Sequence, residues 1–298
     1  MLLFFLTSLF AFNSAVHLPT AQNVAINEAI NLQQVQQFPK SLGIELTAKS
    51  ALVIDADSGK IIFQKNVDQP LPIASLTKLM SALVFLNTNP DWQKITTYST
   101  QDNIPAKEQQ QDLEPSQIIF RDGEEIKTSD LFAAALVKSA NNAINTLVRE
   151  TPFCCGDNFV GQMNKTAQAL GMKQTIFTEP TGLSSKNIAS ARDLSRLILV
   201  GKDKKELVDA LSYKIYSFQT TLNKQSIFHR VNNTNKLLDS FLQTQLAKTG
   251  YLNEAGYCYA GLVSYQKNNF VVIILGAQSE KDRQQEVKGL AVWAAENY

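Results

Sequence analysis

The order of hydrophobic and polar residues predicts strands near both ends of the folded part of the chain and helices between them. Residues 51–55 and 61–65 are β-rich runs on either side of a turn that contains Gly59, and together they predict a hairpin. In residues 75–86, apolar side chains recur with the period of a helix. Pro72 lies just before this segment, where a helix tolerates proline.

The middle of the chain has helical patterns, and its last part is mainly β-rich. Helices are predicted over residues 128–137, 158–170, 190–200 and 204–211, and again over 279–297 at the end. β-rich segments occupy residues 213–220, 256–265 and 270–276. Ser190 and Asp193 have the spacing of a capping box. Because strands and helices are segregated, we predict an α+β fold: an antiparallel sheet flanked by helices, with a mostly helical subdomain over roughly residues 80–210.

The chain begins with a short apolar run, LLFFLTSLFAF at residues 2–12, which is too short to span a bilayer as a helix. It has the length of a signal-peptide core and small residues follow it, although no Lys or Arg precedes it. We expect a signal peptide over about residues 1–21, a Gln- and Asn-rich extension over 22–45, and one folded domain over 46–298. This predicts export to the periplasm or another extracytoplasmic space; the alternative is a buried N-terminal strand or helix.

Charge and cysteine content narrow the classes of function. The 28 basic and 27 acidic residues give a net charge of +1, which argues against a nucleic-acid partner and against a basic membrane anchor. Cys154, Cys155 and Cys258 do not have metal-ligand spacing, and His17 and His229 are the only histidines, so we expect no metal. A disulfide from Cys154 or Cys155 to Cys258 remains open.

A serine and a lysine at helical spacing carry the candidate chemistry. If His17 is removed with the leader, a Ser-His-Asp triad must use His229. Ser75 and Lys78 are three positions apart, so on a helix they share a face at its positively polarised N-terminus. A buried lysine loses proton affinity and can act as a base near neutral pH.

Two further motifs follow in order, Ser139-Ala140-Asn141 and Lys248-Thr249-Gly250. Each of the three motifs has a second copy elsewhere in the chain, in a segment less suited to catalysis. The copies are Ser264–Lys267 in a strand-like run, Ser185–Asn187 in a loop and Lys127–Ser129 at a helix start. Residues three apart on a strand point to opposite faces, so that copy of the first motif cannot cooperate.

The sequence resembles the low-molecular-mass penicillin-binding proteins, the D-alanyl-D-alanine carboxypeptidases and endopeptidases, over about residues 45–295. The resemblance rests on PIASLTKLM at 72–80, LVKSANNA at 136–143, EPTGLS at 179–184, ARDL at 191–194, NTNKLL at 233–238 and KTGYLNEAGYC at 248–258. It implies a β-lactamase/transpeptidase-like fold, no cofactor, muropeptides that end in or are cross-linked through D-Ala as substrates, and β-lactams as covalent inhibitors.

The resemblance implies a role for each motif residue. Ser75 would attack the carbonyl and form the acyl-enzyme, with Lys78 as the base, an assignment that is disputed in this superfamily. Ser139 would relay a proton to the leaving amine. Asn141 would bind the substrate's amide backbone and orient Lys78.

The third motif is implied to bind the substrate's carboxylate. Lys248 would steer that group and lower the pKa of Lys78, and Thr249 would hydrogen-bond it. Gly250 would let a substrate backbone approach closely. The backbone N–H groups of Ser75 and Tyr251 would form the oxyanion hole.

Three alternatives remain open. Carboxypeptidase and endopeptidase activities differ only in the leaving group. The chain ends soon after Gly250, so we expect neither the C-terminal β-domain nor the anchor helix of many relatives, which slightly favours an endopeptidase. A serine β-lactamase needs a deacylating Glu, and the loop with Glu179 lacks its Glu-x-x-Leu-Asn spacing. A non-catalytic peptidoglycan-binding protein is the third possibility.

Overall fold

The computed structural model describes residues 45–103, 116–153 and 157–298. The predicted signal peptide, nearly all of the extension, and Cys154 and Cys155 therefore lie outside the described residues. Cys258 is a buried free thiol.

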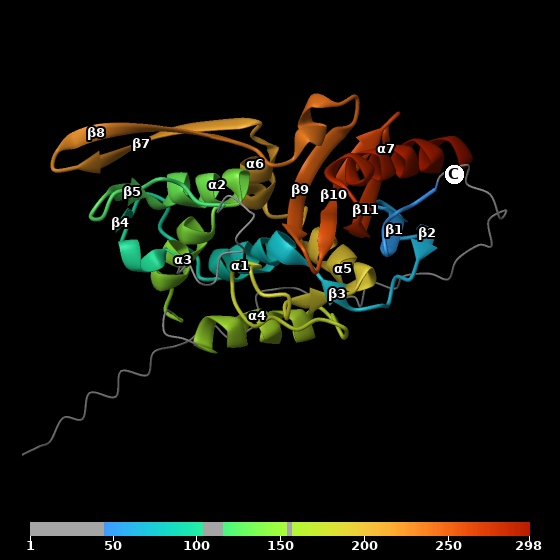
Figure 1. Cartoon of the computed structure of the whole chain (residues 1–298), viewed down its shortest axis with the longest axis horizontal. Helices are drawn as coiled ribbons and strands as arrows, with labels where there is room; N and C mark the ends of the chain where they lie inside the picture. Colours follow the sequence, from blue (N-terminus) through green and yellow to red (C-terminus); the bar gives the residue numbers. More distant parts are fainter. Residues whose placement is uncertain (1–44, 104–115, 154–156) are drawn as a thin grey trace, which may run out of the picture.

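A five-stranded antiparallel sheet forms one half of the molecule (Figure 1). Its order is β2 (Ile61–Lys65), β1 (Ser50–Asp55), β11 (Asn268–Ala277), β10 (Gly256–Tyr265) and β9 (Gln243–Leu252). The predicted hairpin is confirmed as the β1–β2 pair, and the two β-rich segments near the end of the chain are confirmed as β10 and β11.

Helices cover both faces of this sheet. The terminal helix α7 (Glu280–Asn297) packs on one face and α5 (Ala191–Gly201) packs on the other. Alternate residues of β11 enter two separate hydrophobic clusters: Val272 and Ile274 face α7, whereas Ile273 and Leu275 join the larger core of the helical half. The sheet is therefore the middle layer of three.

The other half is built mainly from helices. They are α1 (Thr77–Leu86), α2 (Thr128–Lys138), α3 (Asn141–Arg149), α4 (Asp157–Ala169) and α6 (Lys205–Ser212). A second sheet, in the order β4 (Ile95–Thr97), β5 (Glu125–Lys127), β7 (Ile215–Leu222) and β8 (Gln225–Asn232), packs on α2. Short elements complete the chain: strands β3 (Leu71–Pro72) and β6 (Ile188–Ala189), and 3₁₀ turns η2 (Ala74–Leu76), η3 (Thr100–Asp102) and η5 (Lys236–Asp239).

The predicted α+β class is confirmed, with two local differences. The segment predicted as one helix over residues 75–86 starts with the 3₁₀ turn η2 before α1 begins. The capping box at α5 is half formed: the Ser190 hydroxyl accepts from the Asp193 N–H, but the Asp193 carboxylate accepts from Gln174 and Thr175 instead. No pattern predicted β8, because most of its residues are polar or exposed.

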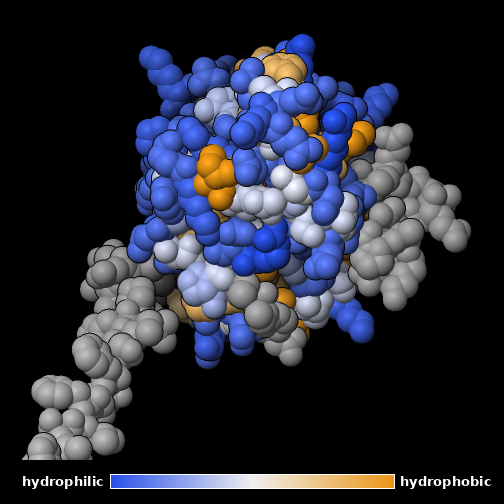
Figure 2. All heavy atoms as spheres, turned by 90° about the vertical axis from the view of Figure 1, so that its left-hand side faces the viewer, coloured by the Kyte–Doolittle hydropathy of each residue, from blue (hydrophilic) through white to orange (hydrophobic). Residues whose placement is uncertain are grey.

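The end of the molecule that carries the β7–β8 hairpin tip is mainly hydrophilic. Figure 2 views it from this side and shows hydrophobic side chains only as small separate groups. Exposed apolar residues such as Ile119 and Phe228 are scattered, as is normal for a folded protein surface.

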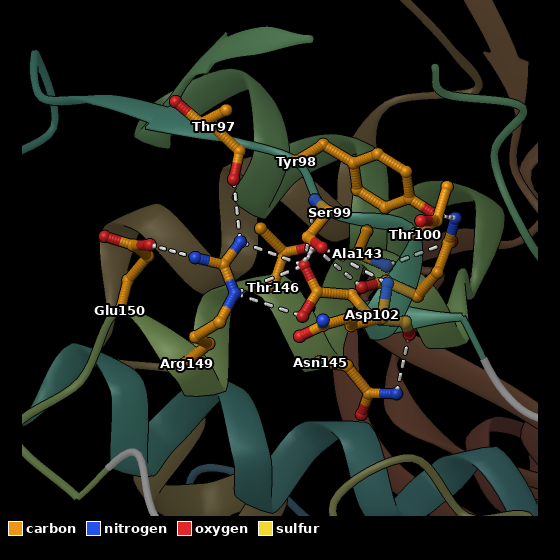
Figure 3. A network of polar contacts seen from close by, with 12 residues as sticks. Thr97, Tyr98, Ser99, Thr100, Asp102, Ala143, Asn145, Thr146, Arg149 and Glu150 are labelled. Carbon is orange, nitrogen blue, oxygen red and sulfur yellow. Dashed lines mark hydrogen bonds and ion pairs between the residues drawn. The ribbon is translucent and has the colours of Figure 1, made fainter. Parts of the chain in front are cut away.

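A polar network fixes α3 to the segment around η3 (Figure 3). Arg149 donates to both oxygens of Asp102, with distances of 2.9–3.3 Å, and to the carbonyl of Thr97 at 2.7 Å. The Thr146 hydroxyl also donates to Asp102, whose side chain is buried. Asn142, at the start of α3, bonds the backbone of Ile118 through both its amide atoms. These contacts hold α3 at both its ends.

We expect Asp102→Ala to lower the free energy of unfolding by about 2–3 kcal/mol, because several hydrogen bonds to a buried charged group are lost. Urea denaturation measures this change. Asp209→Ala is the control, since its ion pair with Lys205 lies on the surface of α6 and should contribute little. Equal stability of the two variants would contradict the proposed importance of the network.

Candidate active site

The turn that carries Ser75 is tightly constrained. Ala74 has a left-handed backbone with φ of 48°, a conformation that disfavours any residue with a side chain. Ser75 follows in the 3₁₀ turn η2, and the Thr77 hydroxyl donates to the Ala74 carbonyl at 2.8 Å. The Ser75 side chain is therefore presented at the start of α1, one turn before Lys78.

Lys78 is fully buried, and its amine meets three oxygen atoms. The Nζ atom lies 3.0 Å from Ser75 Oγ, 2.6 Å from Asn141 Oδ1 and 2.5 Å from the Thr181 carbonyl oxygen. The amine is thus held by groups from η2, α3 and the loop between α4 and α5. The first two predicted motifs converge at this atom.

Burial lowers the pKa of Lys78 to about 7, because the charged amine loses its hydration; the carboxylate of Glu179 acts in the opposite direction. The sequence-based expectation was that Lys248 lowers this pKa. The structure instead makes burial the main cause, and the repulsion between the two amines lowers the pKa of Lys248.

Ser139 and Asn141 lie at the junction of α2 and α3, as expected. Ser139 ends α2 in a left-handed conformation, with φ of 62°, and Asn141 is the first residue of α3. Ser116 holds the junction: its hydroxyl donates to the carbonyl of Ser139, and its own carbonyl accepts from the Asn141 N–H. The Ser139 hydroxyl is buried and has no hydrogen-bond partner within the described ranges.

Lys248 and Thr249 lie in β9, at the edge of the large sheet. The Lys248 amine donates to Thr234 Oγ1 at 3.4 Å, and Thr249 Oγ1 lies 2.8 Å from the same oxygen. Burial lowers the pKa of Lys248 well below its usual range, and the charges of Lys78 and Arg283 lower it further. Lys248 is therefore within electrostatic reach of two other basic side chains, Lys78 of α1 and Arg283 of α7.

Gly250 lies against the nucleophile turn itself. A Cβ atom at this position would approach Ile73 O and Ser75 N to 3.0 Å, and the Cβ of Ala74 to 3.1 Å. The glycine is therefore needed for packing against the protein's own turn, a reason that the sequence did not indicate. The close approach holds β9 at Gly250 against the backbone of the nucleophile turn.

Motif reasoning missed four of the residues at the site. Thr181 supplies a carbonyl oxygen, which any residue type carries; its only signal was the EPTGLS segment. Thr234 lies in NTNKLL, another segment that carries the family resemblance, but the sequence analysis assigned it no role. Arg283 and Asn187 had no predicted part, and Asn187 belongs to the rejected second copy of the Ser-x-Asn motif.

His229 lies away from this site. Its Nε2 atom is 2.5 Å from Glu124 Oε1, and its ring stacks on Phe218 within the β7–β8 hairpin. The structure therefore does not support the alternative hypothesis of a Ser-His-Asp catalytic triad that uses His229. Among the residues that the structure describes, no cluster of three or more His, Cys, Asp or Glu side chains could hold a metal ion.

Comparison with known proteins identifies the family. Residues 33–279 match the D-alanyl-D-alanine carboxypeptidase family, Peptidase S11. The chain belongs to this family. It is therefore a serine-type D,D-peptidase, and the resemblance seen in the sequence is confirmed.

Individual relatives agree with this assignment. The D-alanyl-D-alanine endopeptidase of Pseudomonas aeruginosa is 34% identical over 245 residues, which cover 78% of this chain and 72% of the relative. A D-alanyl-D-alanine carboxypeptidase of Bacillus subtilis is 31% identical, and the match covers 84% of this chain but only 63% of that relative.

Solved structures show the same fold. The Streptomyces K15 DD-transpeptidase superposes with a TM-score of 0.76 at 21% identity, covering 85% of this chain and 98% of that one. Penicillin-binding protein D2 of Listeria monocytogenes, solved with cefotaxime bound, has a TM-score of 0.67 at 26% identity, with the same coverage of both chains.

We expect Gly182→Ala to lower the free energy of unfolding by about 2–5 kcal/mol. Gly182 has φ of +87°, and an added Cβ would lie 2.1 Å from the Ala74 carbonyl oxygen, so the loop or the nucleophile turn must move. Thermal or chemical denaturation measures the loss.

Gly59→Ala is the matched control for this substitution. Its φ of +72° imposes a similar backbone strain, but the space around it is open. Its cost should therefore be only about 1 kcal/mol. If both variants lose the same stability, the contact between the loop and the turn is not what constrains position 182.

Proposed function

We propose that Ser75 is the nucleophile of this D,D-peptidase and that Lys78 is its general base. The observation that carries the proposal is the 3.0 Å contact between Ser75 Oγ and a buried amine whose pKa is about 7. Near neutral pH, a large fraction of that amine is uncharged and can accept the hydroxyl proton as Ser75 attacks. The attack forms an ester to the acyl group, and the C–N bond to the leaving amine breaks.

The neighbouring groups suit the remaining steps. Among the described residues, the buried Ser139 hydroxyl has no hydrogen-bond partner, which suits it to pass a proton to the leaving amine. Asn141 orients Lys78 through its Oδ1 atom, which leaves its Nδ2 atom for the substrate's amide backbone. Water then hydrolyses the ester and restores Ser75.

Lys248 and Thr249 are proposed to bind the carboxylate end of the substrate. Both contact Thr234, and their β9 strand is held against the nucleophile turn through Gly250. The backbone N–H groups of Ser75 and Tyr251 are proposed as the oxyanion hole, because donors aimed at developing negative charge stabilise the transition state. Only the backbone of Tyr251 is needed for this role, and its side-chain hydroxyl donates to Asn253 instead.

The proposed substrates are peptidoglycan peptides, and the proposed reaction is endopeptidase cleavage of cross-links through D-Ala. The relative from Pseudomonas aeruginosa is named as an endopeptidase and matches most of this chain. β-Lactams are proposed as covalent inhibitors, since a related structure holds cefotaxime. Such substrates lie outside the cytoplasm, so we propose an exported protein.

In the part of the chain that the structure describes, no helix is both long enough and apolar enough to cross a membrane.

Labelled penicillin should form one covalent adduct, on Ser75, and Ser75→Ala should abolish it. Peptide mass mapping locates the label. Defined muropeptides then separate the two activities: cleavage of cross-linked dimers indicates an endopeptidase, and release of free D-Ala indicates a carboxypeptidase. Folded protein that forms no adduct and cleaves neither substrate would refute the proposed function.

The rate of acylation by penicillin should rise with pH through about 7 and then level off, because Lys78 must be uncharged to accept the proton. Below that point, the second-order rate constant should fall about tenfold per pH unit, as for a single titrating group. Stopped-flow measurements over a pH series test this. A rate that is independent of pH between 5 and 8 would show that Lys78 is not the base.

A further inference from the structure

The Glu179 carboxylate is turned into its own loop, where it binds several donors. Its Oε2 atom accepts from the N–H and the hydroxyl of Thr181, at 2.7 and 2.5 Å. Its Oε1 atom accepts from the Gly182 N–H at 2.6 Å and from Asn187 Nδ2 at 2.7 Å. A carboxylate with four short contacts of this kind sets the path of the backbone between residues 179 and 187.

Thr181 connects this carboxylate to the candidate base. Its N–H and hydroxyl bind Glu179, and its carbonyl oxygen lies 2.5 Å from the Lys78 amine. One residue of backbone therefore separates the carboxylate from the amine. The orientation of the carbonyl that Lys78 contacts depends on how Glu179 holds the other side of the same residue.

Asn187 anchors the same loop to the helix that carries Lys78. Its side chain is fully buried, and its Nδ2 atom donates to Glu179 and to the Thr77 hydroxyl at 3.1 Å. Its Oδ1 atom accepts from the N–H and the hydroxyl of Thr178. The loop is thus tied to α1 beside the nucleophile turn, so that a change at Glu179 is transmitted to the site.

We propose that Glu179 is a positioning residue of the D,D-peptidase reaction: acting through Thr181, its carboxylate holds the carbonyl oxygen that fixes the Lys78 amine beside Ser75. This inference rests on the proposed function, because it presupposes that Lys78 serves Ser75 as a base.

The charge of Glu179 has a second consequence for Lys78. The charged groups around this amine are Glu179 on the loop and Lys248 on β9, with Arg283 of α7 behind Lys248. Glu179 is the one group among these that raises the pKa of Lys78, and it opposes the larger effect of burial. Without this carboxylate, the amine would lose its proton at a lower pH.

The geometry does not suit Glu179 as the base that activates water for deacylation. Such a carboxylate needs an oxygen free to accept from water, and both oxygens of Glu179 are engaged by donors of the loop and of Asn187. The two roles predict different kinetics, because a deacylating base acts only after the acyl-enzyme has formed.

The test compares Glu179→Gln, Glu179→Asp and the control Glu206→Gln, which removes a carboxylate from an exposed position on α6. The second-order rate constant for acylation by a fluorescent penicillin is measured for each full-length variant between pH 5 and 9. Glu179→Gln should acylate at least tenfold more slowly at its optimum. The acid limb of its pH profile, the range in which the rate rises with pH, should move to lower pH by about one unit. A shift of this size in the pKa of Lys78 is expected when an opposite charge near the amine is removed.

Glu179→Asp should also be slower, because its shorter side chain reaches the Thr181 donors less well, but its acid limb should stay in place. Glu206→Gln should behave as the unaltered protein does. A purely structural role of Glu179 would lower the rate without moving the limb. If Glu179→Gln does not fold, Thr181→Val removes only the hydroxyl that binds Glu179, and it should slow acylation with the limb unchanged.

An unmoved acid limb in Glu179→Gln would overturn the inference, whether its rate is lowered or equals that of the wild type. So would normal acylation followed by a long-lived acyl-enzyme, which would make Glu179 the deacylating base. Wild-type rates in both Glu179→Asp and Thr181→Val would overturn it if the Gln variant is unfolded. These results differ from failure of the proposed function, in which the unaltered protein itself forms no adduct.

Discussion

The site depends on the burial of one amine, that of Lys78, among oxygen atoms from three separate segments. Water would solvate the charged form of this group far better than the protein interior does, and this difference brings its pKa down to about 7. The three oxygen contacts then hold the amine in place in whichever protonation state it has. The lowered pKa of Lys78 depends on the folded structure, because the helices and the loop must all be in place before the amine is buried.

The fold places a second buried lysine, Lys248, within electrostatic reach of Lys78. Lys248 is buried in β9, and its partners among the described residues are hydroxyl and carbonyl oxygens rather than a carboxylate. A buried unpaired charge is costly, which is why its pKa also falls. A carboxylate placed beside Lys248 would favour its charged form, which agrees with the proposed role of Lys248 in binding the substrate's carboxylate.

Much of this arrangement could be predicted from the sequence. Strands β1, β2, β10 and β11 of the large sheet have β-rich sequences, whereas β9 has no strong apolar run. The order of Ser75, Lys78, Ser139, Asn141, Lys248 and Thr249 along the chain indicated one site. The prediction failed where the signal is not a residue type. The Thr181 contact is made by a backbone carbonyl, and Asn187 acts inside a loop whose motif looked accidental. Strand β8 was missed because a partly exposed strand needs no apolar pattern.

The backbone around Ser75 is enclosed from two sides. A methyl group at Gly182 of the loop would collide with it, and one at Gly250 of β9 would crowd it. Ala74 meanwhile adopts a left-handed conformation that it would not keep on its own. The peptide unit that carries the Ser75 N–H therefore has little room to shift. If the Ser75 N–H belongs to the proposed oxyanion hole, its position is therefore set by the protein before any ligand binds.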